Sequence, residues 1–521
     1  MKLSASFLLV SSLAAWADVR LPALVSDNMV LLQDAKANVW GWAEPGEKVT
    51  VKLGDKSAQG TADDKGRWSV KLTELKPGVA GDLTIAGKNT LTVKNVAVGE
   101  VWIASGQSNM EFPLSKAKDA EKEVAASDLP DLRVFTVTRK GSATPLDDVT
   151  GTWEVSSPKT SGHFTAVGYF FARELQAKLK APIGLIHSSW GGTPVETWIP
   201  ESGMKSNPAF GNHWKAKQEA YPKAKADYDE ALAKYKEAAE KAKAAGQPAP
   251  KAPRAPDGPD ALSAAPMGLF NGMIAPLAPY TIRGAIWYQG ESNAGNTNRG
   301  NMALYAQLFP TMILAWRYEF ARAQDVPREE SEFPFLFVQL ANYYPRRDTP
   351  VDSYWAQVRE AQFGTLEVPR TGMAVAIDVG EAADIHPTNK QEVGHRLAIS
   401  ALAQVYFQEM EFSGPLYAGL QNEEGKIRLS FTNSEGMKSR DGGPLKGFAV
   451  AGEDKKFVWA EATIEGDHVV VWSPTVKDPV AIRYAWADNP DGNLVNGAGL
   501  PASPFRSDDW PQNPPAGSAG N

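Results

Sequence analysis

The sequence contains no cysteine among its 521 residues. This absence excludes disulfides, thiolate metal sites and cysteine nucleophiles, so the stability of the chain must come from the burial of apolar side chains. Histidine is scarce too, with six residues, and no H-E-x-x-H pair of the kind that binds zinc is present. We therefore expect neither a metal site nor another cofactor.

Long hydrophobic runs are also lacking. Beyond the first residues, no stretch reaches the roughly 18 apolar residues that a membrane-spanning helix needs. Residues 1–17 have the parts of a secretory signal: Lys2, a short apolar run and Ala15-Trp16-Ala17 as a cleavage site. We therefore expect an exported protein, periplasmic or extracellular, that does not insert into a membrane.

Positive charge is not in excess. The net charge of −7 argues against nucleic acid or an anionic membrane surface as a partner. Apolar residues make up 43% of the chain and tryptophan occurs 16 times, which indicates a globular protein. A length of 521 residues suggests about three domains.

Two regions show the alternation of apolar and polar residues that is typical of strands in antiparallel sheets. The first region, residues 18–95, contains runs such as Lys48–Leu53 between turn residues. The second region, residues 411–511, contains runs such as His468–Trp472. We predict a β-sandwich-like domain in each region.

The region between them, residues 96–410, has a different pattern. Uniformly apolar runs alternate with amphipathic helical segments, which predicts a parallel sheet covered by helices. The expected strands are Val101–Ser105, Ile183–Ser189, Ala285–Gln289, Phe335–Leu340 and Met373–Asp378. Ligands of such sheets bind outside the carboxyl ends of the strands. The residues there are Gly106-Gln107-Ser108, Trp190-Gly191-Gly192-Thr193, Gly290-Glu291-Ser292-Asn293, Ala341-Asn342 and Val379-Gly380-Glu381.

An insertion at about 201–265 interrupts this plan. Trp214, Tyr221, Tyr228 and Tyr235 are spaced seven residues apart and predict one aromatic face on a long helix. Gly246 and the proline-rich run that follows should end the helix and form a stiff, extended link. We expect a helical arm that packs on the domain or on a second subunit, so a homo-oligomer is possible through this insertion.

Ser108 follows the first expected strand at a turn into a helix. A serine at such a turn is exposed, lies near backbone N–H groups and is favoured as an alkoxide by the helix dipole. We interpret Ser108 as the nucleophile of a hydrolase, with capping of the helix as the alternative role. The glycine that ends the G-x-S-x-G motif of α/β-hydrolases is replaced by Met110, which argues against that fold.

A serine nucleophile needs a base, which is normally a histidine. Among the six histidines, His386 is the one that follows the last expected strand, in Ala383-Asp384-Ile385-His386-Pro387. Residues two apart in an extended segment point the same way, and Pro387 favours that conformation. Asp384 can therefore orient the His386 ring while the other ring nitrogen faces Ser108.

Four blocks in this order resemble the SGNH hydrolases in their sialate O-acetylesterase branch. They are Gly106-Gln107-Ser108-Asn109-Met110, the run from Ser189 to Trp198, the run from Trp287 to Asn293, and Asp384-Ile385-His386-Pro387. The resemblance spans about 96–408, and the flanking β regions also look like that branch. It implies an α/β fold: a three-layer, flavodoxin-like parallel-sheet domain with flanking β-sandwich domains.

The resemblance also implies roles for individual residues. Ser108 would be the nucleophile, His386 the base and Asp384 its partner. The oxyanion hole would combine the Ser108 amide, an amide of Gly191 or Gly192, and a side-chain amide. Many relatives have G-x-N-D where this chain has Gln289-Gly290-Glu291-Ser292-Asn293, so either Gln289 or Asn293 could supply that amide.

We therefore expect a secreted carbohydrate O-acetylesterase that acts on O-acetylated sialic acid through an acetyl-enzyme. An esterase of acetylated xylan or of another acetylated glycan is the alternative within this class. The alternatives outside this class are a non-catalytic glycan-binding protein and a two-carboxylate glycoside hydrolase. The glycoside hydrolase would leave Ser108, His386 and Asp384 without a role.

Overall fold

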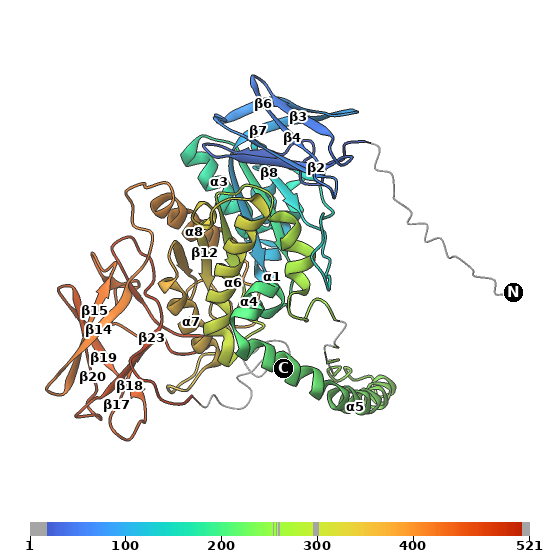
Figure 1. Cartoon of the computed structure of the whole chain (residues 1–521). Coiled ribbons are helices and arrows are strands. Elements are labelled where there is room, and N and C mark those ends of the chain that lie inside the picture. Colours follow the sequence, from blue (N-terminus) through green and yellow to red (C-terminus); the bar gives the residue numbers. More distant parts are fainter. Residues whose placement is uncertain (1–17, 254, 257, 259–260, 295–301, 513–521) are drawn as a thin grey trace.

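The computed structural model of the chain describes residues 18–253, 255–256, 258, 261–294 and 302–512 (Figure 1). The predicted secretory signal at 1–17 lies outside the described residues. Among the helices of the described ranges, none combines the length and the apolar character that crossing a bilayer requires.

A mainly parallel sheet forms the centre of the molecule, in the order β13-β12-β11-β7-β10-β8-β9. Its strands are β7 (Thr90–Gly106), β8 (Leu129–Thr136), β9 (Trp153–Ser156), β10 (Ile183–Ser189), β11 (Gly284–Tyr288), β12 (Phe335–Gln339) and β13 (Thr371–Val375). Neighbouring strands are parallel except β9, which runs antiparallel to β8. The five predicted strands are present. The pair β8 and β9 was not predicted, because Pro130 and Asp131 at the start of β8 read as turn residues.

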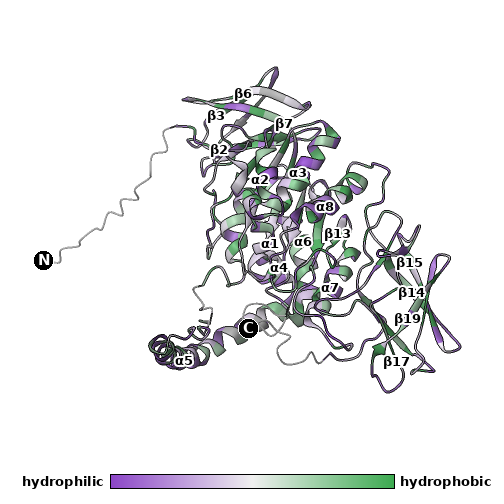
Figure 2. Ribbon diagram, turned by 180° about the vertical axis from the view of Figure 1, so that it is seen from behind, coloured by the Kyte–Doolittle hydropathy of each residue, from purple (hydrophilic) through white to green (hydrophobic). Residues whose placement is uncertain are grey.

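Helices cover both faces of this sheet. The main ones are α3 (Ala166–Leu179), α6 (Met302–Gln324), α7 (Tyr354–Gly364) and α8 (Lys390–Gln404). On one face, Trp102 of β7 meets Phe171 of α3, with ring centroids 5.1 Å apart. On the other face, Phe309 of α6 meets Phe337 of β12 at 5.1 Å. Figure 2 shows that hydrophobic residues gather in these central strands and in the inner sides of the helices.

The strand β7 joins the N-terminal region to the central sheet. It is 17 residues long, so the predicted change of region at Val96 falls inside one continuous strand. The other N-terminal strands are β1 (Val30–Leu32), β2 (Ala37–Trp42), β3 (Lys48–Leu53), β4 (Lys56–Thr61), β5 (Arg67–Leu72) and β6 (Gly78–Ala86). Both β1 and β6 pair with β7, whereas β2 and β5 form a separate pair. A backbone shared in this way fixes the N-terminal region to the central sheet.

The C-terminal region contains two four-stranded sheets, in the orders β14-β15-β20-β19 and β18-β17-β21-β23. Their strands are β14 (Leu416–Glu423), β15 (Lys426–Thr432), β17 (Phe448–Ala451), β18 (Val458–Trp459), β19 (Glu461–Glu465), β20 (His468–Trp472), β21 (Ala481–Tyr484) and β23 (Phe505–Arg506). A short pair, β16 (Lys438–Ser439) and β22 (Leu494–Val495), accompanies them. Tyr417 of the first sheet stacks on Phe505 of the second at 4.3 Å.

A buried arginine ties this region to the central domain. Arg359 of α7 donates hydrogen bonds to the carbonyls of Leu340 and Ala341, which follow β12. It also donates to the carbonyls of Ala487 and Asp488 in the C-terminal region, at 2.6 and 3.0 Å. Because a buried guanidinium must keep these partners, the two regions are held at a fixed separation at this point.

The predicted helical arm is present. Helix α5 (Pro208–Ala244) follows the short helix α4 (Glu201–Ser206) and projects away from the body of the molecule (Figure 1). Gly246, with φ of 66°, follows its end. Gly258 then lies against the Tyr221 ring, so the chain is back beside the helix at this residue. The helix contacts α4 and α6.

Candidate active site

The turn that carries Ser108 depends on a glycine. Gly106 ends β7 with φ of 137°, and a Cβ added there would lie 2.2 Å from the carbonyl oxygen of Tyr288 on β11. Only glycine tolerates this conformation and this approach. The N–H of Gln107 donates to the same carbonyl at 2.9 Å. The end of β7 is thus locked against β11, and the short helix α1 (Ser108–Glu111) begins directly after it.

Ser108 is half-buried, and the loop after β10 passes close to it. A Cβ added to Gly191 would lie 3.2 Å from the Ser108 Cβ. The N–H of Gly191 donates to Glu111 Oε2 at 2.6 Å, and Glu111 also pairs with Arg139. Gly192 has φ of 71°, which again favours glycine. The structure therefore brings the two predicted oxyanion glycines to the nucleophile turn, with one amide bonded to a carboxylate.

His386 reaches the same place from the loop after β13. Its ring stacks on Phe112, the residue that follows α1, with centroids 6.5 Å apart and planes inclined by 25°. Asp384 lies beside it: Asp384 Oδ1 accepts the backbone N–H of His386 at 2.8 Å and is 3.5 Å from His386 Nδ1. The predicted acid and base therefore adjoin each other next to the helix that carries Ser108.

A buried asparagine links the serine turn to the histidine loop. The Nδ2 group of Asn109, the residue after Ser108, donates to the carbonyl of Ile385 at 2.9 Å. It also donates to Glu291 Oε1 at 2.5 Å. Lys390 Nζ donates to the other side of this amide, at Asn109 Oδ1. One side chain thus connects α1, the loop after β11, the residue before His386 and the start of α8.

The charges in this network influence the histidine. Burial lowers the pKa of Lys390 to about 7, against the attraction of Glu291. Burial raises the pKa of Glu291. The pKa of His386 is lowered, first by burial and then by the positive charge of Lys390, while Asp384 acts in the opposite direction. A lowered pKa keeps the imidazole neutral near pH 7, which is the form a general base requires.

The two candidate amides, Gln289 and Asn293, lie beneath the Gly191 loop and are buried. Gln289 Nε2 donates to Asn293 Oδ1 at 2.7 Å and to the carbonyl of Thr193 at 3.3 Å. Asn293 Nδ2 donates to Glu196 Oε2 at 2.9 Å, and its Oδ1 accepts the N–H of Val195 at 3.0 Å. Both amides therefore support the loop that carries the predicted oxyanion glycines.

Sequence reasoning did not find Asn109, Glu196, Glu291 and Lys390. The first three lie inside the blocks that carry the family resemblance. A polar side chain in a segment expected to be buried was a signal that could have marked them. Lys390 follows the histidine block with no spacing that marks it. Its role depends on a contact between residues 281 positions apart, which only the fold reveals.

Comparison with known proteins identifies the family. The model of the family described as "Carbohydrate esterase, sialic acid-specific acetylesterase" matches residues 98–246 and 269–403. The chain belongs to this esterase family. The matched ranges contain Ser108, the Gly191 loop, Gln289, Asn293 and the His386 loop.

Relatives in this esterase family align over most of the chain. The sialate O-acetylesterase of Mus musculus is 30% identical, with 89% of this chain and 89% of that protein covered. The human sialate O-acetylesterase is also 30% identical, over 92% of this chain and 91% of that protein. A solved structure of a carbohydrate acetylesterase from Xanthomonas citri is 38% identical, with a TM-score of 0.79, 95% of this chain covered and 100% of that one.

Proposed function

We propose that this protein is a carbohydrate O-acetylesterase that removes O-acetyl groups from sialic acid. Membership of the esterase family supports the reaction class, and the sialate O-acetylesterases among its relatives support the sugar. One observation supports this reaction above all others. At α1, Ser108 lies close to the Gly191 backbone, and the His386 ring lies nearby with Asp384 beside it.

In the proposed mechanism, Ser108 Oγ attacks the acetyl carbonyl carbon while His386 accepts the hydroxyl proton. Asp384 orients the ring and favours the imidazolium. The tetrahedral intermediate collapses, and the sugar oxygen leaves with the proton that His386 held. Water then loses a proton to His386 and attacks the acetyl-Ser108 carbonyl, which releases acetate and restores the serine.

The intermediate carries a negative oxygen that needs N–H donors. We propose the amides of Ser108 and of the Gly191-Gly192 turn for this role. Because Glu111 accepts the Gly191 N–H, its carboxylate must give way before the substrate oxygen can take that donor. Gln289 and Asn293 remain the candidates for the side-chain amide. Their bonds to Thr193, Val195 and Glu196 favour at least a supporting role beneath the loop.

A second substrate class rests on a specific observation. The carbohydrate acetylesterase from Xanthomonas citri is more similar to this chain than the mammalian enzymes are, at 38% against 30% identity. That enzyme is described as a carbohydrate acetylesterase, without mention of sialic acid, so another acetylated glycan such as xylan is the alternative substrate. Acetate release measured side by side on O-acetylated sialic acid and acetylated xylan separates the two, because the preferred substrate should show the higher kcat/KM.

Replacement of Ser108 by alanine tests the mechanism. We expect Ser108→Ala to abolish acetate release from an aryl acetate and labelling by a fluorophosphonate, since both reactions need the serine oxygen. Ser115→Ala is the matched control, because Ser115 is an exposed serine a few residues further on. It should retain full activity and labelling. Undiminished turnover of Ser108→Ala would exclude the acetyl-enzyme mechanism.

We further propose that the central region is a three-layer SGNH hydrolase domain, with the flanking β regions as sandwich-like domains. The parallel order of the strands and the helices on both faces support this assignment. Export to the periplasm or the medium, and association through the α5 arm, remain proposals from the sequence. Cell fractionation and the mass of the protein in solution would test them.

A further inference from the structure

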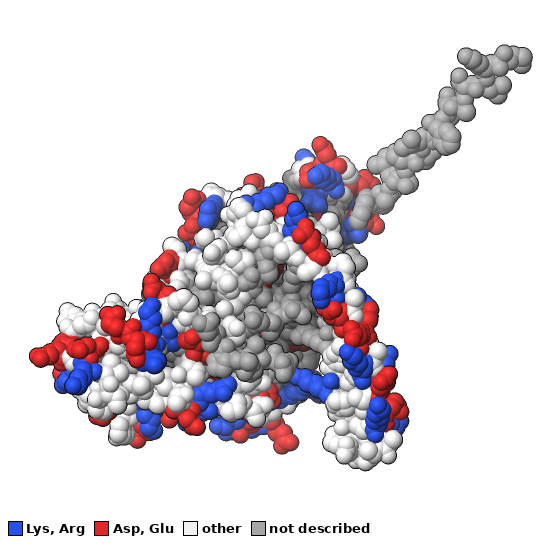
Figure 3. All heavy atoms as spheres, turned by 90° about the horizontal axis from the view of Figure 1, so that it is seen from below, with Lys and Arg blue, Asp and Glu red and all other residues white. Residues whose placement is uncertain are grey.

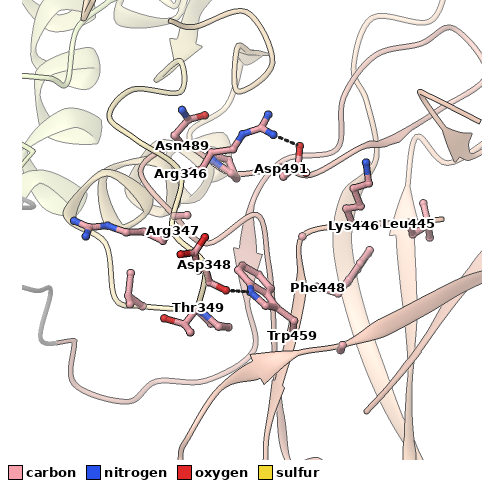
Figure 4. Close-up of a pocket in the computed structure, with 16 residues that line it drawn as sticks. Arg346, Arg347, Asp348, Thr349, Leu445, Lys446, Phe448, Trp459, Asn489 and Asp491 are labelled. Carbon is pink, nitrogen blue, oxygen red and sulfur yellow. Dashed lines mark hydrogen bonds and ion pairs between the residues drawn. The ribbon is translucent and has the colours of Figure 1, made fainter. Parts of the chain in front are cut away.

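A cavity of about 400 Å³ lies away from Ser108, between the loop after β12 and the C-terminal β region. Figure 4 shows its two walls: the segment from Arg346 to Thr349 on one side, and Leu445 to Phe448 with Trp459 on the other. A volume of this size is in the range of small-molecule sites. The wall residues come from two regions that Arg359 holds together.

Trp459 is the exposed large apolar side chain in the lining of this cavity. Its side chain stands on the edge strand β18 and is 45% exposed, so a large aromatic face is left open to solvent. The indole N–H is already used, because Trp459 Nε1 donates to the carbonyl of Asp348 across the cavity at 2.7 Å (Figure 4). The ring is therefore held in place by its edge while its face remains available. Such a preorganised face loses little entropy when a ligand stacks on it.

Charged side chains surround the ring. Arg346 pairs with Asp491 at 2.7 Å at the border of the cavity, and Lys446 pairs with Asp441 at 3.1 Å. Arg347 and Asp348 also line the cavity and are exposed. Flat aromatic surface next to charged groups that donate and accept hydrogen bonds matches a pyranose, which has apolar C–H faces and a rim of hydroxyls. The negative face of an indole attracts the weakly positive C–H groups.

The cavity is connected to the histidine loop. Asn489, one of its lining residues, accepts a hydrogen bond from Asn342 Nδ2 at 2.9 Å. Asn342 Oδ1 in turn accepts the N–H of Gly380 at 2.6 Å, in the segment that leads to Asp384 and His386. The loop that forms the cavity wall follows β12, whose carboxyl end opens on the same edge of the sheet as that of β7.

Figure 3 shows the molecule from the side on which α1, α4 and α5 lie in Figure 1. Charged side chains lie mostly around the border of this side, and uncharged surface occupies much of the middle that is described.

We propose that this cavity is a second sugar-binding site. It takes one pyranose unit of the same glycan that carries the acetylated sugar, stacked on Trp459. This proposal rests on the proposed function. It extends the substrate of the active site at Ser108 from a single sugar to a glycan chain.

Direct binding tests the cavity independently of catalysis. We would titrate the Ser108→Ala protein, which cannot turn over substrate, with xylohexaose and with a sialylated glycan released from a glycoprotein, by calorimetry. Binding of at least one of them should weaken about five- to tenfold in Ser108→Ala/Trp459→Ala, since one stacked ring is lost. Equal affinity in the two proteins, or no binding of either glycan at millimolar concentration, would overturn the proposal.

Kinetics distinguish the two proposals. With acetylated glycoprotein or acetylated xylan, Trp459→Ala should raise KM about five- to tenfold at unchanged kcat, whereas hydrolysis of an aryl acetate should not change. Tyr318→Ala is the matched control, because Tyr318 is 47% exposed but stands on α6, outside the cavity lining. Trp459→Phe keeps a flat ring and should retain most of the affinity.

The outcomes distinguish a failure of the proposed function from a failure of the second sugar-binding site. If wild-type protein releases acetate from no substrate, the proposed function fails. If it releases acetate and Trp459→Ala matches wild type on polymer, the second site is absent. Loss of aryl acetate activity in Trp459→Ala would indicate structural damage rather than a lost sugar contact, and would also count against the proposal.

Discussion

Replacement of the buried Lys390 by methionine should shift the pH profile of the esterase. The ammonium of Lys390 lies 4.8 Å from the Phe112 ring centroid, and that ring lies 6.5 Å from the His386 ring. The charge is therefore within about 11 Å of the imidazole. At this separation, a unit charge contributes about 1.5 kcal/mol at an effective dielectric constant of roughly 20, and about 0.4 kcal/mol in water. These energies correspond to a displacement of the acidic limb of the pH profile by about 1 and about 0.3 pH units.

The sign follows from the charge. Lys390 carries a positive charge below its pKa of about 7, and this charge opposes protonation of His386. Without it, the pKa of His386 should rise. The base then becomes protonated at a higher pH, so the acidic limb of the kcat/KM profile should move upward. The limb is measured on an aryl acetate, and its midpoint does not depend on the fraction of protein that is folded.

Lys116→Met is the matched control. Lys116 also lowers the pKa of His386, but it is exposed, so its effect should be smaller and should vanish as salt is added. The shift caused by Lys390→Met should persist in salt, because the charge is buried. An acidic limb that stays in place in Lys390→Met, or that moves to lower pH, would refute either His386 as the base or the electrostatic link to Lys390.

Two further pairs of substitutions test the frame of the site. Gly106→Ala should prevent stable folding, because its Cβ would meet the Tyr288 carbonyl oxygen at 2.2 Å and φ is 137°. Gly211→Ala should be neutral or stabilising by thermal unfolding, because a Cβ at this helical position would meet nothing within 4 Å beyond its chain neighbours and the backbone of its own helix. Soluble, fully active Gly106→Ala would contradict the geometry of the turn. We expect Asn293→Ala to lower kcat on an aryl acetate more than Gln289→Ala, because Asn293 holds both Val195 and Glu196. A larger loss in Gln289→Ala, of the hundredfold order seen for an oxyanion donor, would assign that role to Gln289.

Local patterns were enough to predict the central strands and the nucleophile turn. A buried parallel strand is apolar throughout, as in Ile183–Ser189, and this signal needs no knowledge of its neighbours. The tyrosines spaced along α5 likewise marked a helix face from the sequence alone. Asp384 and His386 were paired from their spacing and Pro387, and they do adjoin in the structure. The family resemblance rested on four short blocks, and comparison with known proteins confirmed it.

Long-range contacts could not be predicted in the same way. The continuity of β7 through Val96 depends on pairing with β1 and β6 up to Gly99, and with β10 and β11 from Glu100 onward. The strand β8 was overlooked because its first residues resemble a turn, although its pairing with β10 makes it a strand.

The sequence by itself determined which residues are candidates for the chemistry: a serine after a strand and a histidine with an acid two residues away, in a chain without cysteine. Tertiary structure decided what surrounds them. Lys390 donates a hydrogen bond to Asn109, 281 residues earlier in the chain, and Trp459 donates one to Asp348, 111 residues earlier. The physical reason is that burial and charge act through space. The pKa of His386 is lowered, and the cavity beside Trp459 forms, only when distant segments of the chain pack together.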